Sequence, residues 1–115
     1  IYIVNDFELK QSLTILKCEV KDIFKFGVKA IVETKGEDGS VIYESESETS
    51  IPARKAKRVV ETTGAGDAYR AGLIYGLLEG LDLPSACRIG SYLGSKNVET
   101  LGGQAYSVTK KELKL

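Results

Sequence analysis

Residues 61–72 join a β-branched segment to a helical pattern through two glycines and put one aspartate at the start of that helix. The first amides of an α-helix have no carbonyl partner inside it, so those of Gly64, Ala65 and Gly66 can point together at an anion. Asp67 follows directly, where a carboxylate could accept the proton of an attacking hydroxyl group. The pattern therefore predicts a phosphate site beside a general base. The alternative is purely structural: glycines that permit a tight turn and an aspartate that favours the helix dipole.

The composition is that of one modest globular domain. Of the 115 residues, 43% are hydrophobic and 28% are charged, which suits a folded chain and argues against disorder. Sixteen basic and sixteen acidic residues cancel, so no bulk charge favours nucleic acid or an anionic membrane surface. No apolar run is long enough to span a bilayer. We therefore expect neither nucleic acid nor a membrane among the partners.

The chain has no histidine, which excludes Ser-His-Asp and Cys-His catalysis and removes a usual ligand of zinc. Cys18 and Cys87 have no CxxC spacing, so we expect two buried thiols in a reducing compartment. There is no methionine, and no basic segment leads into an apolar one as in a signal peptide. We expect an excerpt of a longer, cytoplasmic protein.

Hydrophobic periodicity predicts strands alternating with helices, which is typical of an α/β fold. Strands are expected at residues 1–4, 28–32, 41–43 and around Ile51, with a turn at 34–39 and an exposed acidic hairpin end at 44–48. The strand at 28–32 is almost continuously apolar, which favours a central parallel strand. A helix over residues 5–26, in two pieces around Cys18 and ended by Gly27, would bury one apolar stripe formed by Phe7, Leu13, Leu16, Val20, Ile23 and Phe24.

Two further helices are expected after the glycine run, each with a ridge of small residues. Glycine inside a helix costs about 1 kcal/mol relative to alanine, so close helix packing must offset that loss. We expect the two ridges to face each other. They are formed by Ala68, Gly72, Gly76 and Gly80 in the first helix and by Ala86, Gly90 and Gly94 in the second, which begins near Pro84. Beyond them, Thr109 is expected to cap a short terminal helix.

Residues 62–72 closely resemble the C-terminal signature of the ribokinase-like (PfkB) carbohydrate and nucleoside kinases. The resemblance covers nearly all of this chain but only the C-terminal portion of a family member. It implies a Rossmann-like, three-layer αβα fold, with residues 1–115 as a single nucleotide-binding portion of a larger kinase domain. The missing portion would include most of the substrate-binding half and the lid. The resemblance also implies that Asp67 is the general base and that Gly64, Ala65 and Gly66 form the anion hole.

Two other motifs match the family in the family's order. Asn5 and Glu8 match an Asn-x-x-Glu motif that helps organise Mg²⁺ and phosphate, often through water. Taken alone, the same pair is also a capping box, and both interpretations stay open. Thr34, Gly36 and Gly39 match a loop that contacts the phosphates and sugar of the nucleotide, although such residues suit any hairpin turn.

The end of the chain resembles the helix and loop that wall the adenine pocket. Ser91, Gly94 and Val98 would lie along that wall, followed by the loop at residues 102–104. Glu61 stands where the family usually has an aspartate that helps bind a monovalent cation, which leaves activation by K⁺ open. A basic cluster at residues 54–58 is expected to be solvated surface, with contact to nucleotide phosphate as the alternative.

The resemblance implies an ATP-dependent phosphotransferase that uses Mg²⁺ and moves the γ-phosphoryl group to a hydroxyl of a sugar or nucleoside. The expected partners are ATP, that small acceptor, and the missing N-terminal part or a second copy of the chain. We expect the excerpt alone to be inactive. The alternative function is a non-catalytic α/β fragment that binds a nucleotide or a partner chain.

Overall fold

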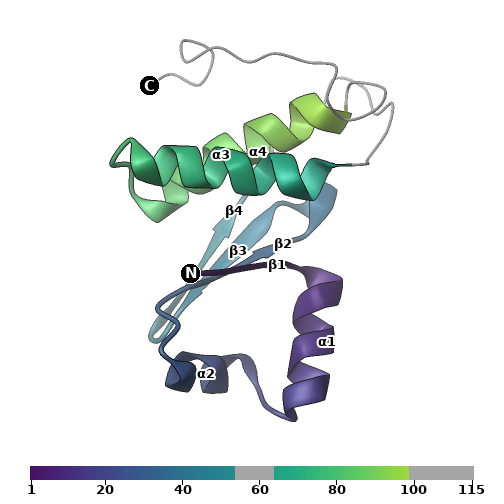
Figure 1. The fold of residues 1–115 in the computed structure, drawn as a ribbon, viewed down its shortest axis with the longest axis vertical. Helices are drawn as coiled ribbons and strands as arrows, with labels where there is room; N and C mark the ends of the chain where they lie inside the picture. Colours follow the sequence, from purple (N-terminus) through teal and green to yellow (C-terminus); the bar gives the residue numbers. More distant parts are fainter. Residues whose placement is uncertain (54–63, 99–115) are drawn as a thin grey trace. The chain divides into compact units, whose positions relative to one another are not determined.

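A computed structural model of the chain describes residues 1–53 and 64–98, which divide between two compact units, Ile1–Pro52 and Ala53–Leu115. The first unit is a four-stranded mixed sheet with short helices, and the second contains a pair of longer helices (Figure 1). Strands and helices of this kind confirm the α/β class expected from the sequence.

The sheet of the first unit has the order β1-β2-β3-β4. Strand β1 (Tyr2–Asn5) pairs in parallel with β2 (Ile31–Thr34), and β2 pairs antiparallel with β3 (Ser40–Glu44). Strand β4 (Ser47–Ile51) completes an antiparallel hairpin with β3. The expectation of a central strand in this region is confirmed, because β2 lies between a parallel and an antiparallel neighbour.

The bounds of β2 differ from the expected residues 28–32. The strand begins at Ile31 and continues through Glu33 to Thr34, while the amide of Tyr2 already donates to the carbonyl of Ala30 over 2.9 Å. Pairing with β1 and β3 therefore extends the strand beyond its apolar residues. The apolar pattern of the sequence contains no information on this pairing.

Helical structure after β1 comes in pieces: α1 (Asp6–Leu16), α2 (Val20–Ile23) and the 3-10 turn η1 (Phe24–Phe26). The predicted break near Cys18 is confirmed. Lys17 adopts a left-handed conformation with φ 53°, and the amide of Cys18 donates back to the carbonyl of Leu13, which ends α1. Gly27, with φ 91°, ends η1 as expected.

The prediction was wrong for two members of the expected apolar stripe, Phe7 and Leu16. Phe7 is 69% exposed, whereas Leu9, which the stripe omitted, is 4% exposed. The two positions lie roughly 200° apart around a helix axis, so they cannot share a face. Leu16 is also exposed, and the core on this side of the sheet is formed by Val4, Leu9, Ile23 and Ile31.

The second unit contains α3 (Ala65–Leu78) and α4 (Leu83–Val98). A Cβ added to Gly72 would lie 2.8 Å from the Cα of Gly90, and one added to Gly76 would lie 2.9 Å from the Cα of Ala86. Backbone therefore meets backbone along the two ridges of small residues. The prediction that these ridges face each other is confirmed.

Gly80 does not belong to the ridge, which corrects the expectation that it lies in the helix. The helix α3 ends before it, and Gly80 takes φ 84° with no atom near its added Cβ. Its amide donates to the carbonyl of Leu77, and that of Leu81 donates to the carbonyl of Gly76. Those two bonds make the left-handed glycine turn that commonly closes a helix.

Both cysteines are free thiols in the structure. Cys87 is fully buried, and this burial raises the pKa of its thiol, as expected for a small core residue. Cys18 is half-buried. The expectations for Thr109, for the basic cluster at 54–58 and for the loop at 102–104 lie outside the described residues. Within the described ranges, no helix has the length and apolar character needed to cross a membrane.

Candidate functional site

The carboxyl ends of β1 and β2 bring two of the predicted motifs together. Asn5, the last residue of β1, is the register partner of Thr34, the last residue of β2. The hydroxyl of Thr34 donates to the carbonyl of Val4 over 3.4 Å. In open α/β sheets, ligands bind outside the carboxyl ends of parallel strands, so this edge is a candidate ligand site.

Asn5 and Glu8 form the capping box that the sequence left open. The amide of Glu8 donates to Asn5 Oδ1 over 2.7 Å, and the amide of Asn5 donates to Glu8 Oε1 over 2.9 Å. Asn5 is exposed and Glu8 is half-buried. This contact satisfies two amides at the start of α1. It does not test the role in organising Mg²⁺.

The donor set around Asn5 and Glu8 fits Mg²⁺ only as an outer-sphere partner. It offers one carboxylate and one amide oxygen, and the described part of the chain has no group of three acidic, cysteine or histidine side chains that could hold a metal. Magnesium keeps several waters and is usually bound through one or two carboxylates together with substrate phosphates. A single carboxylate facing bound water suits that arrangement.

The predicted loop after Thr34 folds as a one-turn 3-10 segment, η2 (Gly36–Asp38). The amide of Lys35 donates to the carbonyl of Gly39 over 2.7 Å, which closes the loop. Gly36 has φ 57°, and Gly39 has φ 90° with ψ −144°, a conformation that is essentially restricted to glycine. The backbone therefore requires glycine at Gly39 and favours it at Gly36.

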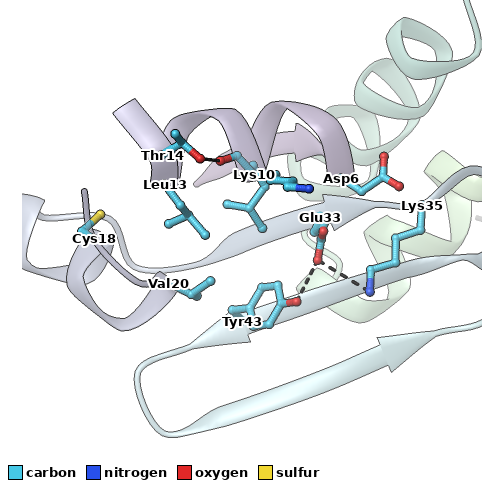
Figure 2. Close-up of a pocket in the computed structure, with 10 residues that line it drawn as sticks. Asp6, Lys10, Leu13, Thr14, Cys18, Val20, Glu33, Lys35 and Tyr43 are labelled. Atoms are coloured by element: carbon cyan, nitrogen blue, oxygen red, sulfur yellow. Dashed lines mark hydrogen bonds and ion pairs between the residues drawn. The ribbon is translucent and has the colours of Figure 1, made fainter. Parts of the chain in front are cut away.

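A pocket of about 490 Å³ lies between α1 and the face of the sheet, next to this edge (Figure 2). Glu33 points into it and is only 8% exposed. Its carboxylate accepts a hydrogen bond of 2.7 Å from the hydroxyl of Tyr43, and the ammonium of Lys35 lies 3.8 Å away. Burial, and then the bond to Glu33, raise the pKa of Tyr43 well above its usual range. Glu33, Tyr43 and Lys35 therefore interact with one another within the pocket.

The glycine run lies at the start of α3, where the sequence predicted that a helix begins. Gly64 is the N-cap with φ 82° and ψ −1°, and its carbonyl accepts the amide of Ala68 over 2.9 Å. Gly64 and Gly66 are both exposed. The amides of the first helical turn have no carbonyl partner within the helix, and the dipole makes this end positive. An anion could therefore approach these amides from solvent.

Asp67 lies in the first turn of α3 with 89% of its side chain exposed. Its Oδ1 is 3.4 Å from Nη1 of Arg70, one turn further along. A pair this exposed contributes little to stability and opens at small cost. The carboxylate is therefore accessible beside the glycine amides.

Of the predicted wall residues on α4, Gly94 reaches the start of α3. A Cβ added to Gly94 would lie 3.5 Å from the carbonyl of Ala65, so Gly94 packs against the first turn of α3. Ser91 is half-buried on α4. Val98 is the last residue of α4, and its side chain lies outside the described residues, as does Glu61.

Asn97 is a residue that the sequence interpretation missed. It is 1% exposed, and a Cβ added to Gly64 would lie 3.4 Å from its Oδ1 and 3.6 Å from its Nδ2. A signal was present in the sequence, because an amide follows Gly94 by three residues on a helix face otherwise made of small residues. The predicted residues thus form two sets, one in each unit, each brought together within its own unit.

The chain contains an open α/β sheet with a glycine-rich loop at its carboxyl edge. It also contains a helix whose exposed first turn carries glycines and an aspartate. Both features are typical of α/β proteins that bind phosphate groups. The chain matches the model of the pfkB family carbohydrate kinases over residues 1–111, and it belongs to that family. Its fold is the C-terminal part of the ribokinase-like α/β fold, as the resemblance implied.

Three relatives illustrate the family. A nucleoside kinase of Methanocaldococcus jannaschii is 39% identical over 101 residues, which are 88% of this chain and 33% of that protein. Its crystal structure, described as an archaeal member of the ribokinase family, superposes with a TM-score of 0.91 and 36% identity over 97% of this chain and 37% of that one. A ribokinase of Lactococcus lactis is 32% identical over 87% of this chain and 32% of its own length.

The third relative is a nucleoside kinase of Burkholderia thailandensis, whose structure in complex with inosine has a TM-score of 0.90 and 36% identity, covering 96% of this chain and 36% of that one. The chain therefore spans about a third of the length of the relatives that it matches.

Proposed function

We propose that the protein containing this chain is an ATP-dependent kinase that transfers the γ-phosphoryl group to a hydroxyl of a nucleoside or sugar. The observation that carries the proposal is the start of α3, where the exposed glycines 64 and 66 precede an accessible Asp67 within one helical turn. A helix N-terminus favours negative charge, and an adjacent carboxylate can remove a proton from an alcohol. Family membership supports the same reaction class.

In the proposed mechanism, Asp67 accepts the proton of the acceptor hydroxyl. The hydroxyl oxygen then bonds to the γ-phosphorus, the bond from that phosphorus to the β,γ-bridging oxygen breaks, and ADP leaves. The amides of Gly64, Ala65 and Gly66 would stabilise the charge on the transferring group. Fixed dipoles of this kind act without reorganising at the moment of reaction, which is why they lower the barrier.

The family resemblance also assigns residues of this chain to the bound nucleotide. The loop that contains Thr34, Gly36 and Gly39 would contact its phosphates and sugar, and Ser91, Gly94 and Val98 would line its base. Asn5 and Glu8 would hold water around Mg²⁺, which would neutralise phosphate charge when bound. The proposed contact of the Thr34 loop with the phosphates is supported by the position of Asn5 and Thr34, which are register partners at the carboxyl edge of the sheet.

A nucleoside is the first acceptor to test. Among relatives matched over more than four fifths of this chain, the nucleoside kinases are 39% and 36% identical and the ribokinase is 32% identical, whereas an inositol 3-kinase is 46% identical over 63% of this chain. This chain spans about a third of the length of these relatives, so the proposal allows residues outside these 115 to contribute to the choice between nucleoside and sugar.

The test is a coupled assay of ADP formation by the full-length protein with MgATP. Inosine and other purine nucleosides form one arm, ribose and other sugars form a second, and a reaction without acceptor is the blank. The proposal expects ADP formation that requires an acceptor and a phosphorylated product detectable by mass spectrometry. Nucleotide binding by calorimetry without turnover on any acceptor would instead support a non-catalytic nucleotide-binding module.

A further inference from the structure

The helix α4 approaches α3 through three successive positions of one face. An added Cβ at Gly90 would lie 2.6 Å from the carbonyl of Tyr69, and one at Gly94 would lie 3.5 Å from that of Ala65. The next position along this face is Asn97, which lies against Gly64. The face thus changes from residues without side chains to a polar amide at the point where it meets the start of α3.

Packing alone does not explain an amide at that point. Asn97 is 1% exposed, and burying an amide is unfavourable unless it is hydrogen-bonded, so an apolar side chain of similar size would fill the space at lower cost. In the described ranges, no buried side-chain nitrogen or oxygen lacks a hydrogen-bond partner, so the amide of Asn97 is satisfied where it lies. A satisfied, fully buried amide has a fixed orientation.

Gly64 is the residue whose conformation directs the amides of the proposed anion hole. Its φ of 82° and ψ of −1° set the plane of the peptide that carries the amide of Ala65. Asn97 occupies the space beside the Cα of Gly64, at 3.4 Å from an added Cβ. A rigid group at that position restricts the movement of Gly64 and of the two amides that follow it.

We propose that Asn97 is a positioning residue that fixes Gly64, and through it the amides of Ala65 and Gly66 and the carboxylate of Asp67, in the arrangement needed for phosphoryl transfer. This inference rests on the proposed function. Asn97 acts through Gly64 and touches neither nucleotide nor acceptor. Its loss should therefore lower the rate of the chemical step and leave the binding of both substrates largely unchanged.

The test uses Asn97→Leu, which keeps the side-chain size and removes both hydrogen-bonding groups, in the full-length enzyme. Turnover is normalised to the folded fraction. We expect kcat to fall by ~10-fold or more, since small displacements near the reacting atoms have effects of up to ~100-fold, while KM for ATP and for the acceptor stays within ~2-fold. A purely structural role would lower the melting temperature without this split between kcat and KM.

Ser95→Ala is the matched control. Ser95 is also a buried polar residue of α4, at 7% exposure, but its hydroxyl donates to the carbonyl of Tyr92 in its own helix over 2.7 Å. It should leave kcat unchanged. A second test combines Asn97→Leu with Gly64→Ala: if Asn97 works through Gly64, the losses in kcat will be clearly less than multiplicative.

The inference is overturned if Asn97→Leu folds and keeps wild-type kcat. It is also overturned if the fold-reduction of kcat in the double variant equals the product of the reductions in Asn97→Leu and Gly64→Ala. If Asn97→Leu does not fold, Asn97→Asp, which keeps the side-chain shape, takes its place. The same result is then expected, a lower kcat with unchanged KM values. If neither variant folds, Asn97 is structural and the inference fails. Asp67→Asn separates this result from the proposed function: turnover retained in Asp67→Asn contradicts the kinase mechanism, whatever Asn97→Leu does.

Discussion

Glu8 combines an observed contact with the backbone and a proposed role toward Mg²⁺. One of its carboxylate oxygens accepts the amide of Asn5 over 2.9 Å, which completes the capping box of α1. Capping needs an acceptor oxygen but no charge, since glutamine serves in this position as well as glutamate. Organising hydrated Mg²⁺ depends on the charge. The two roles can therefore be separated by one substitution.

Glu8→Gln should keep the cap of α1 and weaken the interaction with Mg²⁺. We expect an unchanged melting temperature and a several-fold increase in the Mg²⁺ concentration that gives half-maximal turnover, measured at fixed ATP in the full-length enzyme. Asp6→Asn is the control, because it neutralises an exposed carboxylate in the same first turn of α1. Equal responses of the two variants to Mg²⁺ would mean that Glu8 is a capping residue only.

At the scale of elements, α3 and α4 are held together by backbone contact. Glycine is unfavourable in a helix by about 1 kcal/mol, and the close approach of Gly72 to Gly90 accounts for its presence there. The same geometry predicts that alanine will destabilise the protein at one glycine of α4 and will not destabilise it at another. This pattern is a property of the helix pair and needs no ligand.

Gly90→Ala should destabilise the protein, because its new Cβ would lie 2.6 Å from the backbone carbonyl of Tyr69 and the helices would have to move apart. We expect a loss of about 1–3 kcal/mol in the free energy of unfolding, measured by urea denaturation. Gly94→Ala has an ordinary contact of 3.5 Å and should be neutral or gain up to about 1 kcal/mol from helix propensity. Destabilisation by Gly94→Ala as large as that by Gly90→Ala would contradict this account of the ridge.

On the scale of the whole molecule, the features that the sequence predicted correctly are those that depend on local patterns. The ridges at Gly72 and Gly90, the turn that ends at Gly39 and the break before Cys18 all follow from spacing or from the need for a positive φ. These features are encoded within one helix or one loop, so a sequence pattern is enough to find them.

What the sequence did not predict depends on tertiary pairing. The rotation of α1 that buries Leu9 and exposes Phe7 depends on how the helix meets the sheet, and β2 extends to Thr34 because β1 and β3 offer it partners. Asn97 was missed for the same reason, since it packs against Gly64, 33 positions earlier in the chain. The roles of the predicted site residues stay predictions.

The measurement that tests the account most directly is a comparison of turnover and nucleotide affinity in Asp67→Asn, made in the full-length enzyme. We predict that kcat falls by about 10²–10⁴-fold, because a general base is lost, while calorimetry gives a dissociation constant for ATP close to that of the unaltered enzyme. Glu46→Gln, an exposed carboxylate in the β3–β4 turn, should change neither quantity. Wild-type turnover in Asp67→Asn would contradict the proposed mechanism.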